Sequence, residues 1–407
     1  MFQFKKLFSF MIPGLLLVPS MQGRITDSDR YVLTIKATDK FERSLIANEG
    51  IAIEQVGDGY VTGFGNAEEK AAIEKLGLLI QSAKVSELLS VRDFPTEDAD
   101  FHNYTELKAE LDRLQAAHPT IMSQTAIGKT VEGREIWAVR ISGDLATADA
   151  KPGIIYMGGH HAREHLSVEM PLRWARYLLE QYAAGNVRVK TLVDSRDIHI
   201  VPAVNPDGLE YDIANGKYQF WRKNRRLNSN NNYGVDLNRN YGFLWGTGGS
   251  SANASSDTYK GPSAFSEPET QAIKNHVEAH KNITTLLTFH TFSKLILYPW
   301  GHTDDSVPNG TDLAVFEKMA KKMAEWNGYK PQQSSDLYIT SGDTTDWAYG
   351  EHKIIAFTFE LDPAGGLFSA GGFYPGAKII KEVVDKNIEP CLYLLEYADN
   401  PRRVLNN

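Results

Sequence analysis

Three short segments, far apart in the chain, carry side chains that bind metal ions and transfer protons. The first holds His161 and Glu164 three residues apart, the second holds His290, and the third holds Glu360. Two imidazoles and one carboxylate can hold a zinc ion and leave one coordination position open for chemistry. A second carboxylate nearby can take a proton from water and pass it on. The segments therefore predict a zinc site with a proton-transferring carboxylate.

Each of these residues also has a more ordinary interpretation when it is taken alone. A His-x-x-Glu pair arises often by chance, and a lone His is more often a hydrogen-bonded structural side chain. His160 and His165 flank the first segment and are alternative ligands. Glu360 could face solvent or pair with a cation, although a carboxylate on an apolar strand is costly to bury unless it is paired or used. Asp236 is a candidate for holding a ligand imidazole in place.

The elements around these residues predict an α/β domain with a buried mixed sheet, because near-continuous apolar strands alternate with helices. His290 ends one of these strands, and sites of open α/β sheets form at the carboxyl ends of strands. The segment 224–256 is rich in Asn, Gly and Ser, which predicts a long irregular loop. The expected strands are 135–141, 153–157, 198–204, 284–290, 295–298 and 354–361, and the expected helices include 103–118 and 167–182.

The N-terminal part of the chain has a different pattern. Residues 31 to about 90 read β-α-β-β-α-β, which predicts a small ferredoxin-like α+β unit. Arg92 lies in the link that follows and is a plausible cleavage point for a protease, although an ordinary uncut linker is the alternative. The expected strands are 31–36, a pair within 51–64 and 78–85, and the expected helices are 39–47 and 67–76.

The chain begins with Lys5 and Lys6 before an apolar run at 7–18, which predicts a signal peptide. An uncleaved lipid anchor is the alternative. The net charge of −8 and the lack of a long basic run argue against nucleic-acid binding. Cys391 is the single cysteine, so no intramolecular disulfide is possible, and an exported chain of this kind looks bacterial. We expect Cys391 to be a buried thiol in a C-terminal helix.

Six ordered motifs carry a family resemblance. The chain resembles the zinc metallocarboxypeptidases of the carboxypeptidase A and B type, and within them it looks most similar to bacterial carboxypeptidase T. The resemblance covers residues from about 93 to 400 and implies a mixed central sheet flanked by helices. It also implies that His161, Glu164 and His290 bind one zinc ion. The motifs are 159–165 (GHHAREH), 205–208 (NPDG), 221–225 (WRKNR), 234–240 (GVDLNRN), 289–292 (FHTF) and 357–361 (FTFEL).

The resemblance assigns further roles. Glu360 is expected to activate the zinc-bound water, and Arg222 to stabilise the developing oxyanion. Arg239 and Asn238 are expected to bind the free C-terminal carboxylate of a peptide, with Tyr338 closing over it.

Two basic groups leave alternatives open. Arg163 looks like the family's outer-subsite arginine, but a structural role is the alternative. Lys223, Arg225 and Arg226, beside Arg222, are interpreted alternatively as a solvated basic cluster.

The pocket that selects the C-terminal side chain is expected to have a neutral residue at its key position and a mixed substrate preference. Thr345 stands where the A type of the family carries an aliphatic residue and the B type an Asp. Asp343 could attract a basic side chain, whereas Asp346 before Trp347 is expected to be structural. We predict release of C-terminal residues with a mixed preference, led by hydrophobic residues and extending to basic ones.

The predicted signal peptide indicates a secreted, extracellular protein, and the resemblance implies that it is made as a zymogen. We predict a signal peptide at 1–23, a propeptide at 24–92 that covers the cleft, and a catalytic domain at 93–407. The expected partners are peptide and protein C-termini and an activating protease, with no nucleic acid and no membrane after signal removal, and we expect a monomer. Bacterial relatives bind Ca²⁺ at acidic clusters, but Asp144, Asp149, Glu180 and Glu278 are scattered, so we assign no calcium site.

Three other functions compete with this hypothesis. An inactive peptide-binding protein would have lost a ligand or Glu360, and neither is lost. An N-acyl amino acid deacylase would usually lack the combination of Asn238, Arg239 and Tyr338. An enzyme of bacterial wall peptides would need affinity for D-residues or diaminopimelate, and the sequence leaves such a side activity open.

Overall fold

The computed structural model describes residues 30–85, 94, 99–214, 218–365 and 371–406. The predicted signal peptide, the link around Arg92 and the predicted start of the catalytic domain at Asp93 lie outside these residues. Within the described part of the chain, no helix combines the length and the apolar character needed to cross a membrane.

The N-terminal unit is a four-stranded antiparallel sheet in the order β2-β3-β1-β4, covered by two helices. Asp39 caps α1, and a reciprocal pair of hydrogen bonds between Asn66 and Glu69 fixes the start of α2. The order β-α-β-β-α-β agrees with the sequence prediction. The elements are β1 (Arg30–Lys36), α1 (Lys40–Asn48), β2 (Ala52–Val56), β3 (Tyr60–Asn66), α2 (Ala67–Lys75) and β4 (Leu79–Lys84).

The larger unit contains an eight-stranded mixed sheet within the described residues, in the order β11-β10-β12-β9-β7-β8-β6-β5. The four central strands are parallel to one another, and β6 and β10 run antiparallel to their inner neighbours. The predicted mixed sheet is therefore confirmed. The strands are β5 (Met122–Lys129), β6 (Glu135–Ile141), β7 (Gly153–Met157), β8 (Asp197–Val201), β9 (Ile283–Thr291), β10 (Leu295–Tyr298), β11 (Lys330–Gln333) and β12 (Ile355–Leu361).

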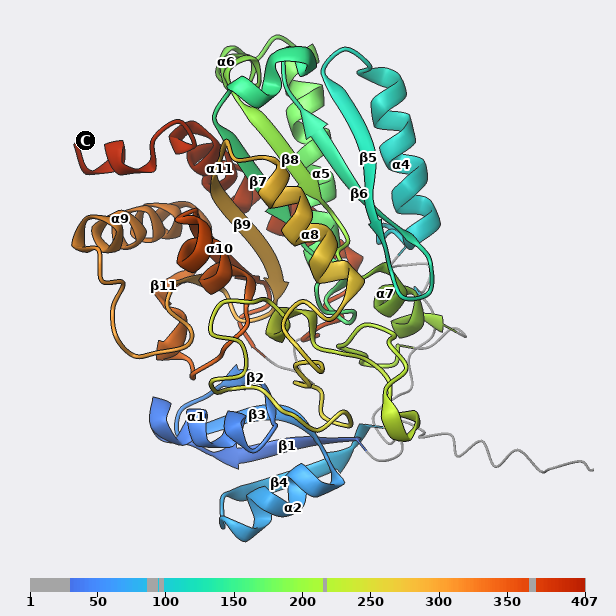
Figure 1. The fold of residues 1–407 in the computed structure, drawn as a ribbon, viewed down its shortest axis with the longest axis vertical. Helices are drawn as coiled ribbons and strands as arrows, with labels where there is room; N and C mark the ends of the chain where they lie inside the picture. Colours follow the sequence, from blue (N-terminus) through green and yellow to red (C-terminus); the bar gives the residue numbers. More distant parts are fainter. Residues whose placement is uncertain (1–29, 86–93, 95–98, 215–217, 366–370, 407) are drawn as a thin grey trace, which may run out of the picture.

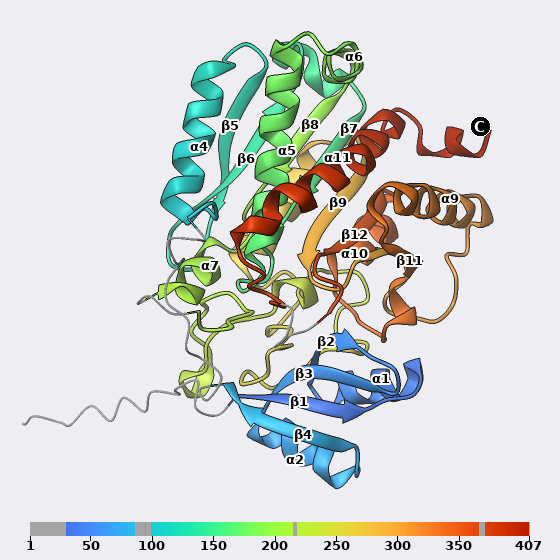
Figure 2. The same cartoon turned by 180° about the vertical axis from the view of Figure 1, so that it is seen from behind.

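Helices cover both faces of this sheet, and each face has its own hydrophobic cluster. Helix α8 crosses one face (Figure 1), and α4, α5 and α11 cover the other (Figure 2). Cys391 is buried in α11, as predicted. The helices are α4 (Tyr104–Ala117), α5 (His165–Ala183), α6 (Val187–Ser195), α7 (Pro206–Asp212), α8 (Pro268–Ala279), α9 (Gly310–Asn327), α10 (Thr344–His352) and α11 (Ile380–Tyr397). Short 3₁₀ helices are η3 (Leu145–Ala150), η5 (Ser229–Asn231), η6 (Leu237–Arg239), η7 (Ser334–Asp336), η8 (Ala377–Ile379) and η9 (Pro401–Asn406).

The two strands that the sequence did not reveal are the edge strands β5 and β11. Strand β5 is half polar, and β11 is four residues long and contains Pro331. An edge strand lacks one neighbour and can carry polar residues and proline, so it does not show the apolar run of the central strands. The long loop at 224–256 holds only short helical turns and isolated bridges, as expected.

The N-terminal unit lies across the end of the larger unit where β9 and β12 finish, below it in both views (Figures 1 and 2). Strand β2 contributes Ile53 and Glu54 to the wall of a cavity at this end of the sheet. The arrangement places one unit over the polar residues that the other unit gathers.

Candidate metal centre and substrate cleft

One cavity of about 90 Å³ brings together most of the residues selected from the sequence. Its wall comes from strand ends, from the loop around 222–239 and from the segment before α10. His290 and Arg163 do not line it, but each contacts a residue that does. The predicted site residues in the wall are His161, Glu164, Arg222, Asn238, Arg239, Tyr338, Asp343, Thr345 and Glu360.

His161, Glu164 and His290 form a tight buried group. Oε1 of Glu164 lies 2.7 Å from Nδ1 of His161, and Oε2 lies 3.0 Å from Nδ1 of His290. The two Nδ1 atoms are 3.2 Å apart. Glu164 is the residue before the first turn of α5, and His290 is next to the last residue of β9. The strand end and the helix start thus bring three ligand side chains to one point.

The chemistry of this group fits a zinc ion. Two imidazole nitrogens and a carboxylate are a donor set of catalytic zinc sites, and their oxygen and nitrogen atoms lie within 4.8 Å of one another. Burial lowers the pKa of His290, so its ring is neutral and has a lone pair to give. Burial alone would raise the pKa of Glu164, but His161 and His290 hold it well below its ordinary value. The carboxylate is therefore ionised and ready for a cation.

Asp236 connects the candidate ligand group to the arginine beside it. Its Oδ1 lies 3.1 Å from Nε2 of His161, and its Oδ2 accepts a 3.0 Å hydrogen bond from Nε of Arg222. A carboxylate on the outer nitrogen of a ligand imidazole fixes the ring and its tautomer. The contact agrees with the position predicted for Asp236.

Glu360 lies directly beside the ligand group because β12 and β9 are paired in register. Glu360 is opposite His290 on the neighbouring parallel strand. Burial raises the pKa of Glu360 well above its ordinary value, and the charges of Glu164 and Glu54 raise it further. A cation at the ligand group would act in the opposite direction and favour the ionised form.

Arg239, Asn238 and Tyr338 line the same cavity from different segments. Nε of Arg239 donates to the carbonyl of Gly249 at 3.0 Å, which fixes the guanidinium. Oδ1 of Asn238 accepts from the backbone and hydroxyl of Thr344 at 3.0 and 2.8 Å. The hydroxyl of Tyr338 donates to the carbonyl of Ile53 at 3.2 Å. The tyrosine therefore binds the N-terminal unit in this structure.

Asp343 and Thr345 lie together at the start of α10. Oδ1 of Asp343 caps the helix by accepting from the amides of Thr345 and Asp346 at 3.0 and 2.9 Å, and it also accepts from the Thr345 hydroxyl at 2.8 Å. Burial and the nearby Asp346 raise the pKa of Asp343 to about 6. Asp346 accepts hydrogen bonds from Gly301 and His302, which agrees with the structural role expected for it.

Arg163 is completely buried and pairs with two carboxylates that the sequence did not single out. It donates to Glu54 of the N-terminal unit, and its Nη1 lies 3.1 Å from Oδ2 of Asp257. The same oxygen of Glu54 accepts from Nη1 of Arg222 at 3.2 Å. Glu54 was missed because its burial depends on contact between two units far apart in the chain, and no local pattern reveals that contact.

The alternative residues have other partners. His160 hydrogen-bonds Tyr241, and His165 lies 2.9 Å from Asp212, so neither points at the ligand group as a third imidazole.

The interpretation of the basic residues at 223–226 as a solvated cluster is wrong, because Lys223 is buried and donates to the carbonyl of Ala254. Arg225 packs over Tyr211, Trp221 and Tyr233, and Arg226 pairs with Glu267.

Comparison with known proteins decides the family. Residues 107–390 match the family model described as zinc carboxypeptidase, well over half of the chain. The chain belongs to the zinc carboxypeptidase family. It is 35% identical to a zinc carboxypeptidase of Saccharothrix mutabilis subsp. capreolus over 399 residues, which cover 93% of this chain and 91% of that protein. Carboxypeptidase A1 of Bos taurus is 32% identical over 287 residues, 69% of this chain and 66% of the bovine protein.

Solved structures of zinc carboxypeptidases share the fold. The crystal structure of carboxypeptidase A from Helicoverpa armigera superposes with a TM-score of 0.75 at 24% identity, covering 93% of this chain and 99% of that one. The protein is therefore a zinc metallocarboxypeptidase, a hydrolase that uses one zinc ion.

The narrower likeness to carboxypeptidase T stays a prediction. No calcium site is assigned, because Asp144 caps η3 and Asp149 pairs with Arg140, which leaves neither in an acidic cluster.

Proposed function

We propose that the protein is a secreted metallocarboxypeptidase, made as a zymogen, that removes hydrophobic and basic residues from the C-termini of peptides. The observation that carries this proposal is the position of Arg239. Its fixed guanidinium lines the same small cavity as the ligand group and Glu360. An enzyme that cuts only the last bond must hold a free carboxylate at a set distance from its reacting groups.

Carboxylate recognition rests on three side chains. Arg239 offers a guanidinium that can hold a carboxylate bidentately, and the amide of Asn238 adds a hydrogen bond. Tyr338 closes over the bound end when its hydroxyl is released from the carbonyl of Ile53. Gly342, at φ +73°, follows in the same segment and permits a turn that other residues resist.

Glu360 and Arg222 have separate roles in the proposed reaction: one transfers a proton and the other stabilises negative charge. A bound zinc ion would polarise the scissile carbonyl and make a water molecule more acidic. Glu360 takes a proton from the attacking water and delivers it to the nitrogen that leaves as the carbon–nitrogen bond breaks. Arg222, held by Asp236, stabilises the negative charge that develops on the carbonyl oxygen.

The N-terminal unit is proposed to be the inhibitory propeptide. Glu54 reaches into the cleft and pairs with both Arg222 and Arg163, with its side chain only 5% exposed. Around it, Arg43 donates to the carbonyls of Leu337 and Asp336, and Asn48 accepts from the amide of Gly249. These contacts occupy the oxyanion arginine and the segment of Tyr338. Cleavage near Arg92 would release them.

Zymogen activation can be tested together with activity. The full-length chain is purified, and half of it is cut near Arg92 with trypsin. Both forms are incubated with a peptide that ends in Leu, with and without a zinc chelator, and products are followed by mass spectrometry. We expect one Leu to be lost with the cut form only, and the loss to stop on chelation and return with added Zn²⁺. Equal activity of both forms would refute the zymogen, and no cleavage by folded, zinc-replete cut protein would refute the peptidase.

A further inference from the structure

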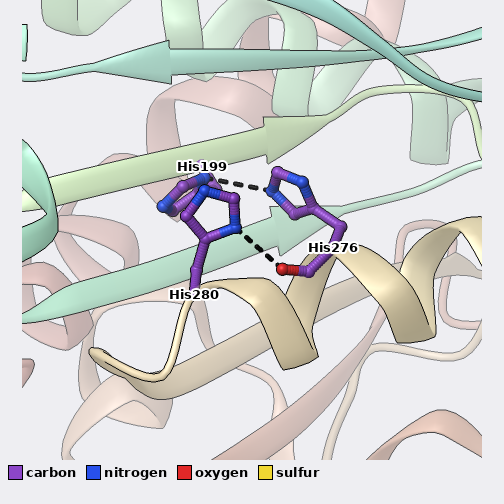
Figure 3. A group of neighbouring side chains, drawn as sticks. All are labelled: His199, His276 and His280. Carbon is purple, nitrogen blue, oxygen red and sulfur yellow. Dashed lines mark hydrogen bonds between the residues drawn. The ribbon is translucent and has the colours of Figure 1, made fainter.

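A second group of histidines lies on the sheet face that α8 covers. His199 belongs to β8, His276 to α8, and His280 directly follows the last residue of this helix. Their rings lie with centroids 4.5 to 4.9 Å apart, and their ligand nitrogens all lie within 4.8 Å of one another. Figure 3 shows the three rings facing one another between the strand and the helix. None of the three lines the catalytic cavity.

The spacing of the inner nitrogens suits a shared metal ion. Nε2 of His276 lies 3.1 Å from Nδ1 of His199. Two nitrogens bound to one tetrahedral zinc ion lie about 3.3 Å apart, since each is about 2.0 to 2.1 Å from the metal. The catalytic ligands of the same molecule show nearly the same spacing, with 3.2 Å between the Nδ1 atoms of His161 and His290.

The outer nitrogens of two of the rings lie against protein oxygens, as they do in metal sites. Nε2 of His199 lies 3.0 Å from Oδ2 of Asp197, a short contact that is not well aligned as a hydrogen bond. Nδ1 of His280 lies 2.8 Å from the carbonyl oxygen of His276 and donates to it. A ligand imidazole usually has its second nitrogen on a carboxylate or a carbonyl, which turns the first nitrogen toward the ion. The contacts leave Nδ1 of His199 and Nε2 of His280 for a metal.

The electrostatic surroundings permit a cation. Burial lowers the pKa of His276 to about 3 and lowers the pKa of His199 as well, so both rings are neutral near pH 7. Arg140 is opposite His199 in register on β6, but Asp197 and Asp149 neutralise it. Asn282 also donates to Asp197 at 2.8 Å, which fixes this carboxylate behind His199.

We propose that His199, His276 and His280 form a second metal site, for a divalent late transition-metal ion such as Zn²⁺, Cu²⁺ or Ni²⁺. Three imidazoles and no carboxylate exclude the hard cations Ca²⁺ and Mg²⁺, which need oxygen ligands. The rings of His276 and His280 are partly exposed, so an ion can enter from solvent and keep a water as its fourth ligand. On binding, the hydrogen between Nε2 of His276 and Nδ1 of His199 moves to Nδ1 of His276 by exchange with solvent, so the ring stays neutral and Nε2 offers its lone pair. The ion joins the end of α8 to the middle of the sheet.

The test is the number of metal ions bound per chain. Full-length protein is dialysed against low-micromolar Zn²⁺, and bound zinc is measured by elemental analysis. We expect two ions per chain in the wild type and one in the double variant His276→Gln/His280→Gln. His118→Gln, at the end of α4 and outside both histidine groups, is the matched control and keeps two. One ion in the wild type, or two in the double variant, would overturn the site.

A second readout separates metal binding from a folding defect. The single variant His280→Gln changes only the residue past the helix end and is expected to fold as the wild type does. A second equivalent of Zn²⁺ should raise the melting temperature of the wild type, because an ion that binds only the folded state stabilises it. The rise should vanish in His280→Gln, while cleavage of peptides by the trypsin-cut forms stays equal. An unchanged rise in this variant would contradict the proposal.

Discussion

Glu360 and His290 occupy paired positions on the neighbouring parallel strands β12 and β9. Side chains at paired positions of adjacent strands point to the same face of a sheet. The register therefore brings the carboxylate of Glu360 beside the ligand group without making it a fourth ligand, since the hydrogen bonds within the group join His290 to His161 and Glu164. This position supports the proposed role of Glu360 as a base beside a bound zinc ion.

Replacing Glu360 by Gln should abolish proton transfer while keeping the shape of the side chain. We expect kcat to fall by about 10² to 10⁴, the usual contribution of a general base. KM and zinc content should stay near wild-type values, because the ligands are untouched. Glu382→Gln, at an exposed position of α11, is the control and should keep full activity. A Glu360→Gln enzyme with more than a tenth of wild-type kcat would show that another group transfers the proton.

Replacing Arg239 by Lys should weaken recognition of the free carboxylate. Lysine keeps the charge but loses the planar fork, and charge-assisted hydrogen bonds contribute about 1.5 to 3 kcal/mol each. We expect kcat/KM on peptides with a free C-terminus to fall about 10- to 100-fold, measured by steady-state kinetics. Arg402→Lys, a surface substitution that also conserves charge, serves as the control. If both variants lost activity equally, Arg239 would have no special part in binding.

Replacing Glu54 by Gln should loosen the N-terminal unit over the cleft. Removing one partner from a buried charge group is strongly destabilising, because Arg163 and Arg222 are left without their shared carboxylate. We expect the uncut variant to be at least about 10-fold more active than the uncut wild type. After cleavage near Arg92 the two catalytic domains have the same sequence, so their activities must agree, which is a built-in control. Uncut forms of equal, low activity would show that Glu54 does not contribute to inhibition.

Asp343 should make the preference for basic C-termini depend on pH. Burial and Asp346 raise the pKa of Asp343 to about 6, so its carboxyl is neutral below that pH and charged above it. The ratio of kcat/KM for a peptide ending in Arg to one ending in Leu should therefore rise between pH 5 and 7, by roughly tenfold for one charge-assisted contact. Asp343→Asn keeps a helix-capping residue and should flatten the ratio. A rise that persists in this variant would exclude Asp343 as its source.

The sequence predicts the central strands and the ligand group well, but it does not predict the contacts between segments that lie far apart in the chain. Buried parallel strands such as β7 and β12 are continuous apolar runs, so their positions follow from the sequence alone. The ligands His161, Glu164 and His290 stand out because their motifs surround them. Glu54 has no such signal, since only the docking of one unit on another gives it two arginines. His276 and His280 were not selected from the sequence, because their third partner, His199, lies on a distant strand and no local pattern joins the three.

The most direct test uses two peptides that differ only at the last group. The protein cut near Arg92 is incubated with a peptide that ends in a free Leu carboxylate and with the same peptide as its C-terminal amide. If Arg239 and Asn238 anchor a free carboxylate beside Glu360, the free acid loses its Leu and the amide stays intact. Cleavage of both peptides at similar rates, or cleavage at an internal bond, would contradict the assignment of this cleft to carboxypeptidase activity.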